Sequence, residues 1–573
     1  MLTRKTESLA GIIIALIFLA SCQKIAYKDK TGITDDPIDY VWDTSTVVQV
    51  TLNGTSITID PAVAEINGSK LTITEAGTYN ITGSLTDGQI VVNSKDESSV
   101  RLILNGVNIT CSNSAPLYIK DSQKTIINLA SGTDNYLTDG AIYSTTDEPK
   151  SALFSNSNLT IFGSGALTVT GKYKDGISTD DGLLIKSGTI SVTAADDGIR
   201  GKDCVIIKSG KITVDSKGDG IKSSNTEDPL LGYVTIDSAL VNITATSGDG
   251  INAKTNLSIG DGSFTIICGG GAGSIATGGP GPGGTSATGY TGTISEKGMK
   301  ATNNIVITKG TFIINSADDA IHSKAGSVTI NGGTFTLSTE DDGIHAPAAI
   351  TFNRGNITIT KCYEGVESSL ITVNTGDINV FSVDDAFNAT KGSATESNDG
   401  SWLYIKGGNI TINASTGDGL DSNGSVAMTA GTVIVQGPQS APEVGFDING
   451  TFNVSGGLVI GSGPNSGNMI EGLSTTTSQY GIKATITSTL AASTLFHIQD
   501  ASGNELITFK PVRSCYYIVY SSPLLLSGST YFICTGGSST GTMTNGIYVG
   551  GTYSGGTAKK NFTVSSKVTN VSF

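Results

Sequence analysis

The chain has 573 residues, of which 74 are glycine, and only 15% are charged against about 25% in an average globular protein. Hydrophobic residues make up 38%, which is enough to build a core and excludes a charged disordered chain. The 50 acidic residues outnumber the 35 basic ones, for a net charge of −15, so nucleic acid is not an expected partner.

The first residues have the pattern of an export signal. Arg4 and Lys5 precede an apolar run at 9–20, which is too short to span a bilayer and has the length of a signal-peptide core. The run ends in Leu19-Ala20-Ser21-Cys22, which resembles the bacterial lipobox and implies cleavage before Cys22 and lipidation of Cys22. We therefore expect an exported protein, lipid-anchored to the bacterial cell envelope at the outer membrane, with a plain signal peptide as the alternative.

Strand-like alternation of apolar and polar residues begins at 71–83 and returns at 99–110 and 157–169. From residue 175 onward one phrase recurs: an acidic residue, then Gly or Ala, then an apolar residue. Its copies begin at Asp175, Asp197, Asp219, Asp249, Asp319, Asp342, Glu364, Asp385 and Asp418, and at Lys297, where Lys replaces the acid.

Most intervals between these copies are within one residue of 22, and each period holds three short alternating segments separated by turn residues. This pattern is typical of one coil of a parallel β-helix. A set of large globular β-domains is a poorer alternative because it would not require a fixed period. The predicted fold is all-β: a parallel β-helix with a coil period of about 22 residues, followed by a smaller C-terminal β-domain.

The period is lost after about residue 436, and 480–573 have the pattern of a compact β-domain with a hairpin at Asp500–Asn504. The predicted divisions are a signal peptide at 1–21, a polar tether at 22–40, the β-helix at 41–436 and the C-terminal domain at 437–573. Most of the cysteines beyond Cys22 lie singly in apolar alternations, where burial is expected. Cys515 and Cys534 lie in neighbouring strand-like runs and are the one pair considered for a disulfide.

Equivalent residues on successive coils lie about 4.8 Å apart, so a column of ionised carboxylates repels itself unless protons or cations intervene. Two explanations are open. Each Asp can simply supply turn geometry and cap backbone N–H groups, or the doubled acids can bind metal. Calcium is the expected ion, because it takes 6–8 oxygen ligands and the sequence offers no His/Cys set suited to zinc.

A variable polar residue follows each acid by three positions and is expected to point outward. Arg200, Lys222 and Lys300 occupy this position as cations that can hold a sugar carboxylate or remain solvated surface charges. His322 and His345 lie one period apart and should be neighbours, although two histidines alone do not make a zinc site.

The phrases DDGIRGKD (196–203), GDGIKS (218–223), DDGIHA (341–346), YEGVES (363–368), DDAFNA (384–389) and GDGLDSNG (417–424) resemble those of the bacterial carbohydrate-binding β-helix proteins. That family is similar in fold to calcium-dependent pectate lyases. The resemblance implies a right-handed parallel β-helix, bound Ca²⁺, and affinity for acidic, pectin-like or cellulosic polysaccharide. The calcium positions it implies are Asp196, Asp197, Asp318, Asp319, Asp341, Asp342, Glu364, Glu367, Asp384, Asp385 and Asp418. Lys297, Ala320 and Ala386 depart from the commoner Asp-Gly-Ile phrase, which leaves the turn geometry there open.

Three functions follow from these residues. The first is a lipid-anchored, calcium-dependent binding protein for polygalacturonate-like polysaccharide or cellulose. The second is a pectate-type lyase, which needs calcium to acidify a proton and a base to remove it, with Arg200, Lys222 and Lys300 as candidates. The third is a surface adhesin in which calcium is structural. No catalytic residue is assigned, because fold alone does not give function.

Overall fold

The computed structural model describes residues 33–145, 148–273, 289–392 and 397–573. Over these ranges the chain is all-β, as predicted, and its helices are the short 3-10 segments η1 (Pro37–Tyr40), η2 (Thr44–Thr46) and η3 (Gly467–Met469). None of the helices in the described ranges has the length or apolar character of a membrane span. The predicted signal peptide and Cys22 lie outside the described residues.

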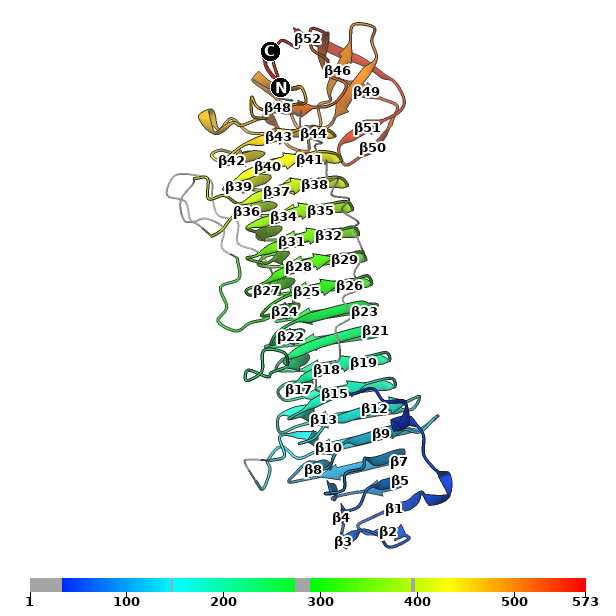
Figure 1. Cartoon of the computed structure of the whole chain (residues 1–573). Helices are drawn as coiled ribbons and strands as arrows, with labels where there is room; N and C mark the ends of the chain where they lie inside the picture. Colours follow the sequence, from blue (N-terminus) through cyan, green and yellow to red (C-terminus); the bar gives the residue numbers. More distant parts are fainter. Residues whose placement is uncertain (1–32, 146–147, 274–288, 393–396) are drawn as a thin grey trace, which may run out of the picture.

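Most strands stack in parallel, coil upon coil, into one elongated molecule (Figure 1). Along most of the stack each coil contributes to three ladders. One is a sheet of 16 strands, called here the site sheet; the other two belong to a sheet of 31 strands, in which β7 (Val100–Cys111), β21 (Tyr233–Ala245) and β23 (Leu257–Cys268) run through both.

The site sheet contains β3 (Glu65–Asn67), β4 (Lys70–Ile73), β6 (Gln89–Asn93), β8 (Leu117–Asp121), β11 (Ser151–Ser155), β14 (Asp175–Thr179), β17 (Ile199–Gly201), β20 (Ile221–Ser223), β22 (Ile251–Ala253), β24 (Met299–Ala301), β27 (Ile321–Ser323), β30 (Ile344–His345), β33 (Val366–Ser368), β36 (Phe387–Ala389), β39 (Leu420–Ser422) and β42 (Phe446–Ile448).

The second ladder contains β9 (Thr125–Leu129), β12 (Leu159–Gly163), β15 (Gly182–Ile185), β18 (Cys204–Ile207), β25 (Ile305–Ile307), β28 (Ser327–Ile330), β31 (Ala349–Phe352), β34 (Leu370–Val373), β37 (Trp402–Ile405), β40 (Ser425–Met428) and β43 (Phe452–Val454). The third contains β1 (Val48–Gly54), β2 (Ile57–Asp60), β5 (Gly77–Leu85), β10 (Asp134–Asp139), β13 (Ala166–Gly171), β16 (Thr189–Ala194), β19 (Lys211–Ser216), β26 (Thr311–Ser316), β29 (Thr334–Thr339), β32 (Asn356–Cys362), β35 (Asp377–Ser382), β38 (Asn409–Ala414), β41 (Thr432–Gln436) and β44 (Leu458–Gly463).

Alternation of side chains explains why these short segments form strands. Inward residues of the site sheet repeat as Ile177, Ile199 and Ile221, which pair in register at offsets of 22 residues and are fully buried. On the third ladder the rings of Phe264, Phe312 and Phe335 stack in the core with centroids 4.8 and 4.5 Å apart. The core is thus a continuous apolar column rather than a set of separate globular cores.

The glycine after each acid is required by how closely neighbouring coils approach. A Cβ on Gly198 would lie 2.2 Å from Cγ1 of Val214 and 2.7 Å from the carbonyl oxygen of Gly220. Ala320 nevertheless keeps the ladder: Met299 N–H donates to its carbonyl, and its own N–H donates to the carbonyl of Asp342. The replacement of Gly by Ala at this turn therefore leaves the coil connection unchanged.

Parallel pairing continues past residue 436, where the sequence pattern predicts the end of the stack. Strands β42, β43 and β44 pair in parallel with β39, β40 and β41, so the stack extends to Gly463. The extra coil is hidden in the sequence because 437–443 lengthen the connection and Val444 stands where an acid is expected.

Beyond the stack, β45 (Gly481–Leu490), β48 (Cys515–Ser521) and β53 (Val568–Ser572) extend the large sheet, with β48 antiparallel to β44. The six-stranded sheet contains β46 (Phe496–Asp500), β47 (Glu505–Phe509), β49 (Thr530–Ser539), β50 (Thr542–Thr544), β51 (Ile547–Val549) and β52 (Tyr553–Thr563). Strands β46 and β47 form the predicted hairpin, and the six cysteines of the described chain are buried and free, Cys515 and Cys534 included.

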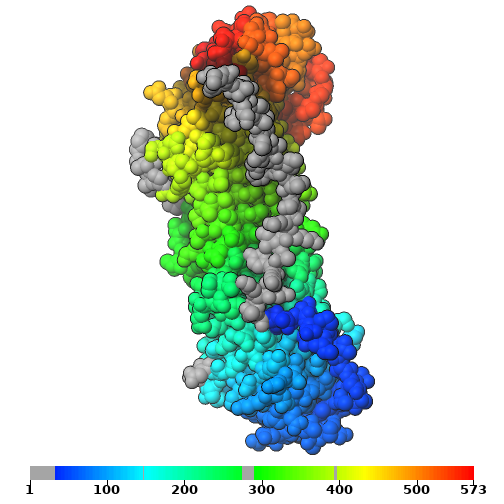
Figure 2. Space-filling view, in the orientation of Figure 1, coloured from blue at the N-terminus to red at the C-terminus, as the bar shows by residue number. Residues whose placement is uncertain are grey.

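The described end of the expected tether lies against the stack, as Figure 2 shows in dark blue beside the cyan coils. Ile33 is buried with Leu184 and Ile206 on the outside of the second ladder. Asp39 forms a buried ion pair with Lys124. Residues 33–40 are therefore held by a small apolar cluster and an ion pair rather than extending freely.

Replacing Phe312 with Ala removes the middle ring of the three stacked phenylalanines and leaves a cavity in the core. We expect the free energy of unfolding to fall by about 3–5 kcal/mol. Urea denaturation followed by near-ultraviolet circular dichroism measures this loss. Lys309→Ala, which changes an exposed side chain in the turn just before the same strand, should leave the urea midpoint nearly unchanged; equal losses in both variants would contradict the assignment.

Candidate functional site

One row of side chains runs along the outer face of the site sheet, and we call it the outer ladder. Its members pair in register from strand to strand, as the sequence pattern predicts for the variable polar position. In order they are Tyr118, Phe154, Ser178, Arg200, Lys222, Asn252, Lys300, His322, His345, Glu367, Asn388, Asp421 and Asp447. The ladder therefore changes from aromatic to cationic, then to histidine, and finally to acidic.

A second row, the acid column, lies at the turn before each of these strands. It comprises Asp175, Asp197, Asp219, Asp249, Asp319, Asp342, Glu364, Asp385 and Asp418. Several members use one carboxylate oxygen to accept the backbone N–H of the next coil: Asp219 N–H donates to Asp197 at 2.9 Å, and Asp249 N–H to Asp219 at 2.8 Å. The turn-capping role considered for each Asp is thus present at these coils.

In the first half of the column, the chain supplies its own cations. Arg200 Nε lies 3.1 Å from Asp175, and Lys222 Nζ lies 3.0 Å from Asp197 and 2.9 Å from Asp219. Lys300 Nζ lies 3.0 Å from Asp249. The three cations predicted to hold a sugar carboxylate are therefore engaged by carboxylates of the protein itself.

Lys297, which replaces the acid in its copy of the phrase, also forms ion pairs with carboxylates of the chain. Its Nζ contacts both Asp318 and Asp319, the latter at 2.7 Å. A cation at the acid position thus neutralises the doubled acids of the following coil. We call the coils from Asp175 to Asp319 the paired half.

The remaining coils form the acidic half. Among the described residues, no lysine or arginine forms an ion pair with Asp342, Glu364, Asp385 or Asp418. Burial, followed by the charges of neighbouring carboxylates, raises the pKa of each of these four groups well above its usual value. Ionisation of these carboxylates is therefore unfavourable, and the chain's own lysines and arginines do not offset it.

Four carboxylate-containing groups bring ligand atoms within 4.8 Å of one another and include predicted calcium positions. They are Asp175–Asp196–Asp197, Asp318–Asp319–Asp341, Asp342–His345–Glu367 and Asp418–Asp421–Asp447. A fifth group joins Asp319 to His322 and His345. Glu364, Asp384 and Asp385 lie in the same column but outside these groups.

Five members of these groups, Asp175, His322, His345, Asp421 and Asp447, are absent from the predicted calcium positions. Asp447 could not be recognised from the repeating phrase because its coil lacks the acid before the glycine. The part of the phrase that this coil keeps is Gly445-Phe446-Asp447, which are the glycine, the inward residue and the outward residue.

Asn388 gives an independent indication of a cation in the acidic half. Its Nδ2 donates to Glu364 at 3.0 Å, whereas its buried Oδ1 has no hydrogen-bond partner in the described chain. That oxygen lies on the outer ladder between Glu367 and Asp421. A buried carbonyl oxygen without a donor is costly unless a cation or water satisfies it.

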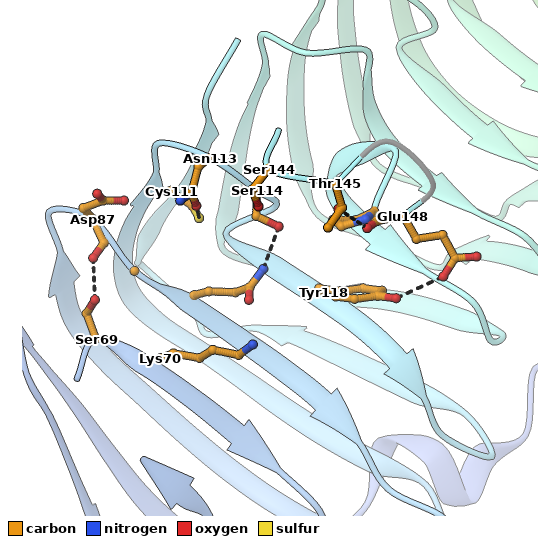
Figure 3. A pocket seen from close by; sticks show the side chains of 13 residues that line it. Ser69, Lys70, Asp87, Cys111, Asn113, Ser114, Tyr118, Ser144, Thr145 and Glu148 are labelled. Atoms are coloured by element: carbon orange, nitrogen blue, oxygen red, sulfur yellow. Dashed lines mark hydrogen bonds between the residues drawn. The ribbon is translucent and has the colours of Figure 1, made fainter. Parts of the chain in front are cut away.

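A polar groove of about 450 Å³ lies near the opposite end of the site sheet, along β6 and β8 (Figure 3). Tyr118 of the outer ladder lines it and donates its hydroxyl hydrogen to Glu148 at 3.0 Å. Gln89 donates to Ser114 at 3.0 Å on the same wall. The groove presents hydroxyl, amide and carboxyl groups, and it lies outside the repeating phrase of the sequence.

Comparisons with known proteins relate the chain to a described family. Residues 67–343, 323–402 and 341–503 match the family described as carbohydrate-binding domain-containing protein. A protein of that description from Acetivibrio thermocellus is 34% identical over 192 residues, 32% of this chain and 64% of that protein, so the chain spans less than two thirds of that relative. A polysaccharide lyase-like protein from C. thermocellum, solved as a gadolinium derivative, shows 35% identity and a TM-score of 0.37 over 39% of this chain and 92% of that chain.

Lys222→Met removes the cation that neutralises Asp197 and Asp219. We expect the free energy of unfolding in chelator to fall by about 2 kcal/mol, less than for a fully buried pair because Lys222 is partly exposed. Added Ca²⁺ should restore part of the loss, because the variant turns a paired coil into an acidic one. Urea denaturation with and without Ca²⁺ measures both effects. Lys309→Met, whose partner Asp261 is exposed, should show neither; equal effects would contradict the pairing argument.

Glu364→Gln tests the buried charge of the acidic half. Because the folded-state pKa of Glu364 is raised, the native protein loses stability as the pH rises above the unfolded pKa of about 4.3. In chelator the variant should therefore be more stable than the unchanged protein at pH 7, with the difference shrinking towards pH 5. Thermal melting across this range measures it. Glu227→Gln alters an exposed carboxylate and should track the unchanged protein; a Glu364→Gln curve parallel to it would contradict the assignment.

Proposed function

Because the chain belongs to the family of carbohydrate-binding domain-containing proteins, we propose that it binds an acidic, pectin-like polysaccharide, or a cellulosic one, along the site sheet in a calcium-dependent manner. The observation that carries this proposal is the acidic half of the column, where buried carboxylates lack lysine and arginine partners among the described residues. The Oδ1 of Asn388 adds a buried oxygen without a donor.

The residues present fit calcium because the donors of the last coils are all oxygens. Glu364, Asn388, Asp385, Asp418, Asp421 and Asp447 would hold the ion or ions. When bound, calcium supplies positive charge and open coordination positions for the carboxylates of a uronate chain. The residues themselves orient these oxygens on one face and hold them at the spacing of the coils.

The proposal narrows the calcium positions implied by the resemblance. At Asp197, Asp318 and Asp319 the cations Lys222 and Lys297 already reduce the negative charge, and Lys297 also acts on the charge of Asp341. Asp196 precedes Asp197 in the same turn. Asp342, Glu364, Glu367, Asp384, Asp385 and Asp418 lie in the acidic half, where added cations are most stabilising. We therefore propose that calcium binds on the coils from Glu364 onward.

A pectate-type lyase has less support. A general base must be neutral at the working pH, whereas the carboxylates of Asp219 and Asp197 raise the pKa of Lys222 above its usual range despite burial. Arg200 and Lys300 are held by Asp175 and Asp249. These contacts favour a binding protein over an enzyme that uses these groups as bases.

The location of the protein forms part of the same proposal. The pattern Leu19-Ala20-Ser21-Cys22 supports lipidation at Cys22 and attachment to the bacterial cell envelope at the outer membrane. A lipid anchor followed by an elongated stack would hold the sugar-binding face away from the membrane.

We also expect the coils of the stack to be right-handed, because crossovers between parallel strands are nearly always right-handed.

A pull-down on polygalacturonate and on cellulose, with Ca²⁺ or with chelator, tests the proposal. We expect retention in Ca²⁺ and its loss in chelator, with Asp421→Asn weakening retention about tenfold because the acidic ladder loses a charged ligand. Glu227→Gln is the matched control and should bind like the unchanged protein.

Retention that is equal with and without chelator would contradict calcium dependence, and absence of retention on both polysaccharides would contradict the binding function. Ultraviolet-absorbing unsaturated ends released from polygalacturonate would instead identify a lyase.

A further inference from the structure

The two histidines of the outer ladder mark the junction between the paired half and the acidic half. The chain has 3 histidines, and His322 on β27 pairs in register with His345 on β30. Their ring centroids lie 4.9 Å apart with the ring planes at 86°. The third, His497, lies on β46 in the C-terminal six-stranded sheet and is buried there.

Two carboxylates converge on His345. Ligand atoms of Asp342, His345 and Glu367 all lie within 4.8 Å of one another, and His345 Nδ1 is 3.5 Å from Asp342 Oδ2. Ligands bound tetrahedrally at 2.0–2.1 Å are about 3.3 Å apart, so the histidine–aspartate separation already suits a shared metal ion. Glu367, the next residue of the outer ladder, supplies the third potential ligand.

Asp342 supplies a second, independent observation. It is 7% exposed, and in the part of the chain that the structure describes its carboxylate accepts no hydrogen bond and lies against the His345 ring nitrogen. The neighbouring Asp319, by contrast, caps the N–H of Asp342 and contacts both Lys297 and His322. A buried carboxylate directed at an imidazole, with neither a donor nor a lysine or arginine beside it, is suited to a metal ion.

We infer that Asp342, His345 and Glu367 form a binding site for a divalent transition metal of the zinc class, separate from the calcium positions farther along the sheet. The nitrogen ligand makes the difference: imidazole suits Zn²⁺, Co²⁺, Ni²⁺ and Cu²⁺, whereas calcium takes oxygen ligands. Three protein ligands leave one coordination position for water or for an oxygen of a bound ligand. His322 is the neighbouring residue of the outer ladder.

Co²⁺ is the probe, because its visible absorption reports coordination number. The full chain, prepared without a polyhistidine tag and stripped with chelator, is titrated with Co²⁺ alone. We expect the intense bands of four- or five-coordinate Co²⁺, saturating at one equivalent, erased by Zn²⁺ and kept in excess Ca²⁺. His345→Gln and Glu367→Gln should each weaken Co²⁺ binding about tenfold or more and remove the bands.

Asp421→Asn is the crossed control, since it changes an acid of the same ladder outside this group. It should keep the Co²⁺ bands while weakening Ca²⁺ binding, and His345→Gln should do the reverse. His345 lies on the outer face and is partly exposed, so its variant should retain the far-ultraviolet circular dichroism of the unchanged protein. Weak octahedral bands only, displacement of Co²⁺ by Ca²⁺, or an unchanged spectrum in both variants would overturn the inference.

Discussion

The spacing between neighbouring strands governs the chemistry of this protein. Residues in register on a parallel stack lie about 4.8 Å apart, and the acid of the recurring phrase is buried at most coils and half-buried at Glu364 and Asp385. Each carboxylate therefore adds repulsion to the next unless something positive lies between them. The backbone provides part of the compensation, as at Asp197 and Asp219, whose oxygens accept the N–H of the following coil. The rest must come from a side chain, a proton or an ion.

The outer ladder determines which of these applies at each coil. Where the ladder residue is Arg200, Lys222 or Lys300, its charge offsets that of the neighbouring carboxylates. These coils need no bound ion for neutralisation. Where it is Glu367 or Asn388, the coil gains further oxygens in place of a cation. The charge balance of each coil is thus set by one register position of the repeat, and the change from coils with a cation to coils without one falls at His322 and His345.

Much of the fold can be predicted from the sequence because the same pattern of apolar, polar and acidic residues recurs in successive coils. The alternation around Ile177, Ile199 and Ile221 and the phrase that precedes each strand predict the stacked strands and the outward ladder. The coil at Gly445–Asp447 could not be predicted, because Val444 replaces the acid before its glycine and the connection that precedes it is longer. The cation pairs could not be predicted, because alternation places Lys222 outward but does not say that its ammonium turns back to Asp197 and Asp219. Likewise, the convergence of Asp342 and Glu367 on His345 depends on side-chain direction, which spacing alone does not give.

In a chain with a net charge of −15, the carboxylates of the acid column are therefore neutralised to different extents in the paired half and the acidic half. Lysine and arginine neutralisation in the paired half is permanent at neutral pH, so that face keeps its character in any divalent ion concentration. Neutralisation of the acidic half by an ion is reversible, and an acidic polysaccharide would be repelled from it without the ion. The polar groove at Tyr118 lies away from both columns and carries no such requirement. With calcium bound as proposed, a polymer lying along the site sheet would meet a metal-independent end and a metal-dependent end, and the ion would set how much of the sheet a charged chain could occupy.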